Sequence, residues 1–411
     1  MPIDTLSRSD TRSSTISITP LSHVRPTSSP PTHHVGSPSS SFTNPWPSFR
    51  ENHSFWQLLR TWFSSERVSP PVPSSRDELV SIQKPNWGSG SHGLKVTWIG
   101  HASFLVETSC APGATRGVRI LLDPVFSERM SPVSFAGPKR FSPTPCRIEE
   151  LPDVDLVVIS HDHYDHLDLH TIRRLYERHR GRIHFFGGLG IEGWFRDIGV
   201  REEDVSVLDW WHGVRVEVAG VGSVDLFCTP AQHFSGRTPF TMGATLWCSW
   251  VILEPNQENS SGSRASEDRS QAMQVTSRRK LYFSGDTGYR TVTESDIGTD
   301  TSTLPFCPAF SEIGKIFGPF DLALLPIGCC TPRTFMSSVH CTPEDSICIH
   351  KDIRSKKSIG MHYGTVRGGI SGHFEDVRDP PKWWKAACEE AGLVWGQDID
   401  LCDIGETVIV H

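Results

Sequence analysis

The sequence has no long apolar run and little net charge. Its 411 residues contain no stretch of about 18 apolar side chains, so no membrane-spanning helix is predicted. Basic residues number 40 and acidic residues 47, a net charge of −7, and no basic stripe with interleaved aromatics occurs. Both observations argue against nucleic acid as a partner. The composition is otherwise globular, 37% hydrophobic and 21% charged, which is enough for a sizeable core.

The chain also lacks secretory features. Its N-terminus has no apolar segment of a signal peptide, and its 11 cysteines include no CxxC pair. These absences favour reduced thiols and an intracellular protein, either cytoplasmic or peripherally attached to a membrane. Arginines in the Ser/Thr-rich N-terminus leave mitochondrial targeting open, although Asp4, Asp10 and many prolines argue against a transit peptide.

Composition divides the chain into a tail and one domain. Residues 1–43 are rich in Ser, Thr, Pro and His with few aliphatics, which predicts a disordered low-complexity tail. Residues 44–411 form the predicted globular domain, with polar surface insertions at 256–277 and 291–303. The segment FWQLLRTWF, residues 55–63, predicts a short helix that packs on the core or, alternatively, contacts a lipid surface.

Apolar, β-branched runs predict many strands with helices between them. The run at 154–160 is continuously apolar, as expected of a buried strand, and 169–176 shows helical spacing. This order indicates an α/β (α+β) fold with two sheets covered by helices. The other strand candidates are residues 95–107, 118–122, 182–186, 214–218, 224–228, 246–253, 280–284, 322–326 and 357–361.

The strongest chemical signal is HDHYDH, residues 161–166, directly after the apolar run 154–160. Imidazole nitrogens and carboxylate oxygens suit Zn²⁺ or a similar divalent ion. At a strand end, His161 and His163 can reach one ion while Asp165 and His166 reach a second. The alternative, a solvated polar loop without a ligand, is weakened by matching residues elsewhere in the chain.

Three more candidate ligands each follow a predicted strand: His233 in CTPAQH, Asp286 in SGDTG and His362 in MHYG. Gly285 and Gly288 let the backbone approach closely, so the carboxylate between them can bridge two ions. Each residue alone could be structural. Together with residues 161–166 they predict a dinuclear metal site.

Such a site provides hydrolytic chemistry. A bound Zn²⁺ lowers the pKa of water from about 15.7 to about 7, so a hydroxide is available at neutral pH. Two ions can also hold the attacked centre and the leaving oxygen. Phosphodiesters, thioesters, lactones and β-lactams all fit this chemistry, and the ligand set does not choose among them.

The motifs HDHYDHLD and SGDTG resemble the metallo-β-lactamase superfamily, which implies a four-layered αβ/βα sandwich with metals at one edge. Longer stretches are similar to the N-acyl-phosphatidylethanolamine-hydrolysing phospholipase D family within it. The similarity runs in order from residue 44 to 405 and departs at the tail and the two insertions. Among the stretches that carry it are NPWPSF (44–49), VTWIGHASFLVE (96–107), LDWW (208–211), TPAQHFSGRT (229–238) and HCTPED (340–345).

The resemblance implies which residues bind each of two zinc ions, with Asp286 as the bridge. The two sets are His161, His163 and His233 for one ion, and Asp165, His166 and His362 for the other.

Other residues of these motifs receive supporting roles. The resemblance places His340 near the substrate phosphate, where it could bind phosphate or protonate the leaving alkoxide; the alternative is an exposed loop histidine. We expect Asp162 to be exposed and Tyr164 to pack against its neighbours. We expect His101 to support the ligands rather than bind metal.

By this resemblance, the protein hydrolyses membrane N-acyl-phosphatidylethanolamine to N-acylethanolamine and phosphatidic acid. A metal-bridging hydroxide attacks phosphorus, and Asp286 and His340 are the catalytic candidates. The resemblance also implies a homodimer. One alternative is another hydrolase of this fold that acts on a lactone, small ester or phosphodiester; a second is a metal-bound protein without activity. Zinc is the expected metal, with another divalent ion as the alternative.

Overall fold

The computed structural model describes residues 15–24, 32–36, 40–51, 53–133, 135–255 and 278–411 of the chain. One half of the molecule is an eight-stranded sheet, antiparallel from its first strand to its fifth and parallel beyond. In spatial order its strands are β1 Ile16–Pro20, β10 Gly213–Val218, β11 Gly222–Thr229, β12 Ser249–Leu253, β13 Lys280–Phe283, β14 Leu322–Pro326, β15 Ser358–Met361 and β16 Ile399–Asp400.

The second half is a seven-stranded sheet, also mixed. Its first four strands pair antiparallel and its last four pair parallel. In spatial order the strands are β17 Thr407–Val410, β4 Leu94–Gly100, β5 Ser103–Glu107, β6 Arg119–Leu122, β7 Leu156–Val158, β8 His184–Gly188 and β9 Val205–Leu208. A separate small hairpin pairs β2 His34–Val35 with β3 Ser41–Phe42.

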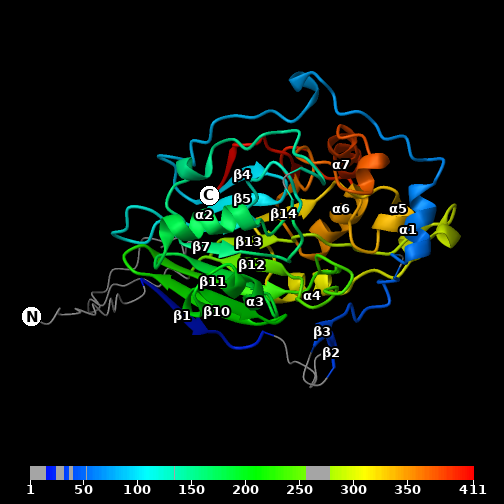
Figure 1. Ribbon diagram of the computed structural model, residues 1–411. Coiled ribbons are helices and arrows are strands. Elements are labelled where there is room, and N and C mark those ends of the chain that lie inside the picture. Colours follow the sequence, from blue (N-terminus) through cyan, green and yellow to red (C-terminus); the bar gives the residue numbers. More distant parts are fainter. Residues whose placement is uncertain (1–14, 25–31, 37–39, 52, 134, 256–277) are drawn as a thin grey trace, which may run out of the picture.

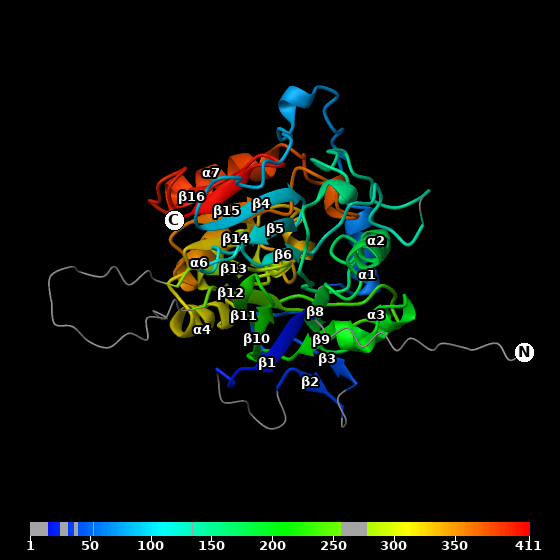
Figure 2. The ribbon, with the colours of Figure 1, turned by 90° about the vertical axis from the view of Figure 1, so that its left-hand side faces the viewer.

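Helices cover the outer faces of the two sheets, and two more, α1 and α5, lie at one end of the molecule (Figure 1). In chain order they are α1 Phe55–Trp62, α2 Leu169–His179, α3 Glu192–Asp197, α4 Ala309–Ile316, α5 Arg333–Met336, α6 Pro343–Asp352 and α7 Asp379–Glu390. Figure 1 gives their order along the chain, and Figure 2 shows α4, α6 and α7 on one outer side and α2 and α3 on the other. The predicted four-layered αβ/βα sandwich is confirmed.

Strand side chains alternate between two cores. In β6, Ile120 and Leu122 join the large core between the sheets, whereas Leu121 joins a second core with Ile172 and Leu175 of α2. Successive side chains of a strand point to opposite faces, so a strand buried on both sides is apolar throughout. This explains why the inner strands are continuous apolar runs in the sequence.

The prediction of a disordered tail is wrong where the structure describes that segment. Residues Ile16–Pro20 form β1, which pairs antiparallel with β10, with Ile16 opposite Val218. The side chain of Ile16 is buried in the large core, and Ile18 packs against it. An edge strand gains backbone hydrogen bonds from an existing sheet. Two isoleucines are therefore enough apolar residues to form a strand here, although the surrounding sequence is polar. Residues 1–14, 25–31 and 37–39 lie outside the described residues.

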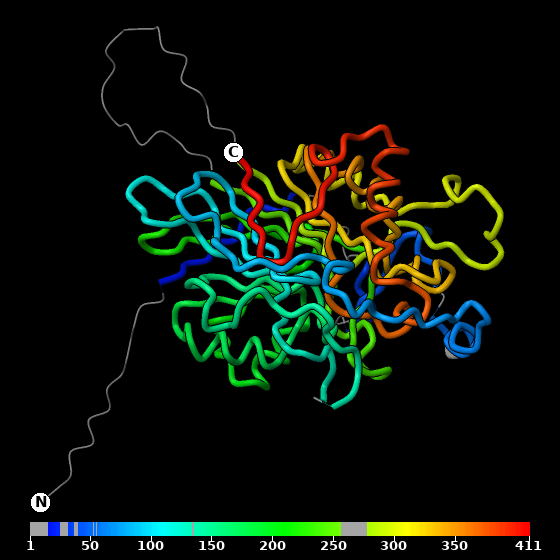
Figure 3. Tube along the Cα trace, turned by 90° about the horizontal axis from the view of Figure 1, so that it is seen from above, coloured from blue at the N-terminus to red at the C-terminus, as the bar shows by residue number. Residues whose placement is uncertain are grey.

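The predicted helix at 55–63 forms as α1, and Ser54 and Gln57 close a capping box at its start. Figure 3 shows α1 at one end of the molecule, together with the segment 291–303. The helix contacts α5 but stays at the surface, with Trp56 77% exposed. Of the two predicted insertions, 291–303 is described and contains two short 3₁₀ turns, whereas 256–277 lies outside the described residues.

Two further expectations concern cysteines and membrane helices. Each of the 11 cysteines is free, as the sequence predicts, and the adjacent pair Cys329 and Cys330 is buried. Among the described residues, no helix has the length and apolarity needed to cross a membrane.

Candidate metal centre

The candidate ligands meet at the edge where parallel strands of both sheets end. The loop 161–166 follows β7, Asp286 follows β13, and His362 comes directly after β15. Strands β13, β14 and β15 run parallel, as do β6 and β7, so their carboxyl ends share an edge within each sheet. Such edges are the usual position of sites in α/β folds. The sandwich therefore brings together residues about two hundred positions apart.

One group contains the three histidines predicted to bind the first ion. His161 Nε2 lies 2.9 Å from His163 Nδ1, and His233 Nε2 lies 3.3 Å from the same atom. The rings of His161 and His163 are 4.5 Å apart and nearly perpendicular. Three ring nitrogens thus converge on one point, as a single divalent ion requires.

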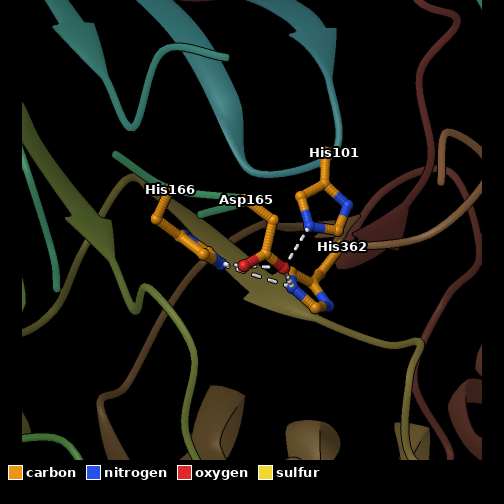
Figure 4. Close-up of side chains that lie close together, drawn as sticks. All are labelled: His101, Asp165, His166 and His362. Atoms are coloured by element: carbon orange, nitrogen blue, oxygen red, sulfur yellow. Dashed lines mark hydrogen bonds and ion pairs between the residues drawn. The ribbon is translucent and has the colours of Figure 1, made fainter. Parts of the chain in front are cut away.

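A second group surrounds Asp165. His101 Nε2 lies 3.1 Å from Asp165 Oδ2, and the Nε2 atoms of His362 and His166 lie 3.6 and 3.8 Å from it. Figure 4 shows the carboxylate between these three imidazoles. The sequence predicts three of the four residues as ligands. The fourth, His101, touches Asp165 as the expected supporting residue would.

Asp286 lies between the two groups. Its carboxylate is 3.1 Å from Nε2 of both His166 and His362, and 4.0 Å from Nε2 of both His161 and His233. A carboxylate that faces both sets of imidazoles is placed as a bridging ligand must be. The structure therefore brings all seven predicted ligands together in the predicted grouping. Their binding of metal stays a prediction.

In His161 and His233, the ring nitrogen that faces away from the centre has a hydrogen-bond partner of its own. Ser160 Oγ lies 2.9 Å from His161 Nδ1, and the carbonyl oxygen of Val339 lies 2.9 Å from His233 Nδ1. A partner at one nitrogen fixes the tautomer and leaves the lone pair of the other nitrogen free for a metal. These two histidines are thus oriented before any ion binds.

Asp123 is a site residue that sequence reasoning missed. Its Oδ2 lies 2.7 Å from His166 Nδ1, and it also accepts hydrogen bonds from the backbone N–H and the hydroxyl of Ser160. The sequence shows only an Asp-Pro pair that ends a strand. Because β6 and β7 are parallel, Asp123 after β6 emerges beside His161 after β7. Knowledge of that pairing would have identified it.

The backbone is strained at three residues of the centre. His101, Asp123 and His362 have φ angles of 55, 37 and 62°, a left-handed conformation that non-glycine residues rarely adopt. His101 turns the chain between β4 and β5, so the single run predicted at 95–107 is two strands. Strain that persists at several residues of one site is typical of a functional centre.

Charge in the centre favours a bound cation. Burial alone would lower the pKa of His166, but Asp286, Asp165 and Asp123 together raise it to about 10. Burial would raise the pKa of Asp286, yet the surrounding histidines hold it well below its ordinary value. Burial and the neighbouring His166 and His163 hold the pKa of His161 well below its ordinary value. The centre thus combines ionised carboxylates with a group of imidazoles, and these carboxylates stabilise positive charge at His166, which a bound divalent transition metal would supply.

A buried carboxylate oxygen that makes no hydrogen bond also favours a bound cation. Asp286 Oδ1 is buried and makes no hydrogen bond with any described residue. Its ionic contact is with Nε2 of His362, at 3.1 Å, and a bound cation would give that buried oxygen and that nitrogen a common partner. The residues therefore fit a pair of metal ions at this centre.

His340 lies beside the centre instead of in an exposed loop. Its Nδ1 is 3.9 Å from Asp286 Oδ2, and its ring centroid is 5.3 Å from that of His233. Burial lowers the pKa of His340 to about 4, and only 11% of its side chain is exposed. It therefore lies beside the predicted ligands Asp286 and His233, and its role toward a substrate phosphate stays a prediction.

The expectation that Asp162 is exposed is wrong. It is buried, and its Oδ1 accepts a hydrogen bond from the backbone N–H of Gly236. Arg237 donates to the carbonyl oxygens of Asp162 and Leu167, at the two ends of the ligand loop. These hydrogen bonds from Arg237 and Gly236 hold the loop 161–166 against the protein. They also satisfy Asp162, which can therefore be buried. Tyr164 packs as expected, with the Arg237 guanidinium 4.4 Å from its ring centroid.

Comparisons with known proteins agree with this fold and centre. Residues 118–363 match the family described as "Beta-lactamase superfamily domain". N-acyl-phosphatidylethanolamine-hydrolyzing phospholipase D 1 of Caenorhabditis elegans is 34% identical over 318 residues, 76% of each chain. An uncharacterized protein of Mycobacterium tuberculosis (strain ATCC 25618 / H37Rv) is also 34% identical, over 76% of this chain and 68% of its own. The mitochondrial N-acyl-phosphatidylethanolamine-hydrolyzing phospholipase D of Saccharomyces cerevisiae is 28% identical, over 76% of this chain and 55% of its own.

The fold and the His/Asp centre define a metal-dependent hydrolase of the metallo-β-lactamase superfamily. Within that superfamily, the chain belongs to the family that includes the C. elegans N-acyl-phosphatidylethanolamine-hydrolyzing phospholipase D 1.

Proposed function

We propose that the protein hydrolyses N-acyl-phosphatidylethanolamine to N-acylethanolamine and phosphatidic acid, using two Zn²⁺ ions. The observation that carries the proposal is the similarity to two proteins with this activity in their names, 34 and 28% identical over 76% of the chain. The uncharacterized mycobacterial relative is as similar as the first, so the substrate needs a direct test.

The chemistry of the centre suits a phosphodiester. A pair of bound zinc ions supplies hydroxide at neutral pH and polarises a phosphoryl oxygen. In this proposal Asp286 binds both ions as a bridging ligand, because its carboxylate faces both groups of histidines. Most of the predicted ligands are buried, which limits the access of bulk water and strengthens electrostatic contacts with the developing charge.

His340 is the residue proposed to handle the substrate. It lies beside Asp286 but is not within the two predicted ligand sets. Burial lowers its pKa to about 4, so the neutral imidazole can donate an N–H hydrogen bond to a phosphoryl oxygen. Substitution of His340 by Ala then lowers turnover while the metal content stays as in the wild type.

A lipid substrate requires contact with a membrane, and exposed apolar side chains support such contact. Trp56 and Phe63 are 77 and 79% exposed at α1, and Phe240 is 98% exposed in the loop after the ligand His233. His53, just before α1, packs against Phe234, which adjoins that ligand. These apolar side chains therefore belong to segments next to the centre, and we propose that they insert into the lipid interface. The homodimer implied by the resemblance stays a prediction.

The direct test uses vesicles that contain N-acyl-phosphatidylethanolamine and protein of measured zinc content. We expect both products by mass spectrometry, and their loss after treatment with a chelator. Asp286→Asn serves as the inactive control, and His92→Gln, at an exposed position outside the predicted ligand sets, as the active control. If zinc-loaded protein forms neither product, the substrate proposal is wrong and a lactone or small ester becomes the next candidate.

A further inference from the structure

A second cluster of metal-binding residue types lies outside the candidate catalytic centre. It joins His33 and His34, at the start of the β2–β3 hairpin, to Asp209, in the turn after β9. His33 Nε2 is 2.7 Å from one oxygen of Asp209, and His34 Nε2 is 2.9 Å from the other. The side chains are 8, 16 and 9% exposed for His33, His34 and Asp209. The proposed reaction uses none of these three residues.

The two rings are arranged like those of the predicted catalytic ligands. The centroids of His33 and His34 are 4.6 Å apart and their planes meet at 90°. In the catalytic centre, His161 lies 4.6 Å from His233 with the planes at 77°. His33 is further held by stacking on Trp210, with the centroids 4.1 Å apart. Two perpendicular, fixed imidazoles can direct both lone pairs at one ion without moving their backbones.

The carboxylate of the cluster is buried and faces both rings. The side chain of Asp209 is 9% exposed, its two oxygens lie 2.7 and 2.9 Å from the imidazole nitrogens, and Oδ1 also accepts a hydrogen bond from the backbone N–H of Trp210. A buried carboxylate is costly in a protein interior unless it is paired with positive charge. A divalent ion bound by the two nitrogens and the carboxylate would supply that charge.

More imidazoles lie nearby. His212 is in the same turn as Asp209, because its backbone N–H donates to the carbonyl oxygen of Asp209. It lies within electrostatic range of Asp209, His33 and His34, and its ring contacts that of His23 at 4.0 Å. Four histidines and one carboxylate are thus gathered around one turn.

We propose that His33, His34 and Asp209 form a third metal site, structural in role, which takes Zn²⁺ or a similar borderline divalent ion. Imidazole and carboxylate ligands in this number leave one position of a tetrahedral ion for water or His212.

This ion would fasten the N-terminal segment to the body of the protein. The same segment supports the catalytic centre further along: Asn44 donates to the carbonyl oxygen of His233, and Ser48 donates to Gln232. Little chain separates the hairpin from Asn44, because β3 ends at Phe42. The backbone N–H of Phe42 also donates to the carbonyl oxygen of Gly243, which attaches the hairpin to the body of the protein. A metal at the cluster would therefore stabilise the N-terminal segment, which contacts the predicted ligand His233 further along the chain.

The test is metal stoichiometry of the full-length protein, equilibrated with buffered free Zn²⁺ and measured by elemental mass spectrometry. The wild type is compared with His33→Gln, His34→Gln and Asp209→Asn, and with the exposed-histidine control His92→Gln. We expect each cluster variant to bind one ion fewer per chain than the wild type, while His92→Gln binds as many. The double variant His163→Ala/Asp286→Asn should still bind the third ion.

Thermal unfolding provides an independent reading and checks that the variants fold. In the His163→Ala/Asp286→Asn background, added Zn²⁺ should raise the midpoint of unfolding, and the further change His34→Gln should abolish this rise. Equal stoichiometry in the wild type and the cluster variants would overturn the proposal and leave the cluster as a hydrogen-bonded clasp. Loss of an ion from His92→Gln as well would assign the extra metal to exposed histidines, which also overturns it.

Discussion

Asp123→Asn should weaken metal binding although it changes neither the volume of the side chain nor the predicted ligands. The fixed backbone N–H of Ser160 points at Asp123 Oδ1, so the amide oxygen of Asn must occupy that position. The amide NH₂ group then faces His166 Nδ1, where Oδ2 accepts a hydrogen bond at 2.7 Å. Two donors would meet there. To avoid this, His166 must move its proton to Nε2, the nitrogen that faces Asp286 and the centre.

The expected magnitude follows from the supporting role. Loss of a residue that orients a metal ligand typically costs about 10- to 100-fold in metal affinity or activity. This corresponds to about 1.4 to 2.8 kcal/mol, since each tenfold change is about 1.4 kcal/mol. Zinc affinity is measured by competition with a chromophoric chelator, and kcat/KM on the vesicle substrate.

A matched control separates this effect from general damage to the fold. Asp168 is also buried and also accepts hydrogen bonds, from Ser127 and Thr171, but it caps α2 and contacts no predicted ligand. Asp168→Asn keeps a good helix cap, so it should leave zinc affinity unchanged. If Asp123→Asn binds zinc within about twofold of the wild type, our assignment of Asp123 as an orienting residue is refuted.

Four further predictions test other parts of the structure. His163→Ala should lose bound metal and activity but keep its circular dichroism spectrum, and retention of full zinc content would remove His163 from the ligand set. Gly285→Ala should destabilise the fold by about 1 to 3 kcal/mol in chemical denaturation, because Gly285 has a φ of +56° and an added Cβ would lie 2.5 Å from Ser160 Cβ; an unchanged midpoint would contradict this. Phe63→Ser, which alters an exposed side chain, should weaken sedimentation with lipid vesicles while preserving hydrolysis of detergent-dispersed substrate; equal sedimentation would exclude Phe63 from membrane contact. Burial lowers the pKa of His184 from 6.5 to about 4, so between these pH values the unfolded chain binds a proton that the folded chain does not. The free energy of unfolding therefore decreases as the pH falls from 6.5 to about 4. His184→Gln should make this decrease smaller, as measured by urea titration at each pH.

The sequence predicts the inner part of the fold well, because strands buried on both faces are apolar along their whole length. The runs at 154–160 and 322–326 contain β7 and β14. It predicts the metal centre for a related reason. A ligand at the mouth of a parallel strand follows an apolar run, so His362 after β15 stands out without knowledge of the neighbouring strands.

What the sequence does not show are contacts made between distant segments. β1 exists because β10, about two hundred residues away, offers a free edge, and composition averaged over a tail cannot detect this. The pairing of His33 and His34 with Asp209 is equally non-local. Asp162 looks like a surface aspartate because the N–H group that binds it belongs to Gly236. These errors have the same origin. The sequence predicts the environment of a residue from its neighbours along the chain, whereas the groups that bury or bind it belong to a distant segment.

The choice of substrate must depend on residues beyond the metal ligands. A set of histidines and aspartates determines how an ester is attacked, and the same set serves lactones and phosphodiesters alike. The segment that begins with NPWPSF contributes no predicted ligand, yet Asn44 and Ser48 within it bind the backbone of His233 and the side chain of Gln232. It then continues to α1 and its exposed aromatic side chains. One continuous segment thus connects a metal ligand to the surface proposed to meet the membrane. The proposal of a lipid substrate therefore depends on this segment in a way that it does not depend on HDHYDH.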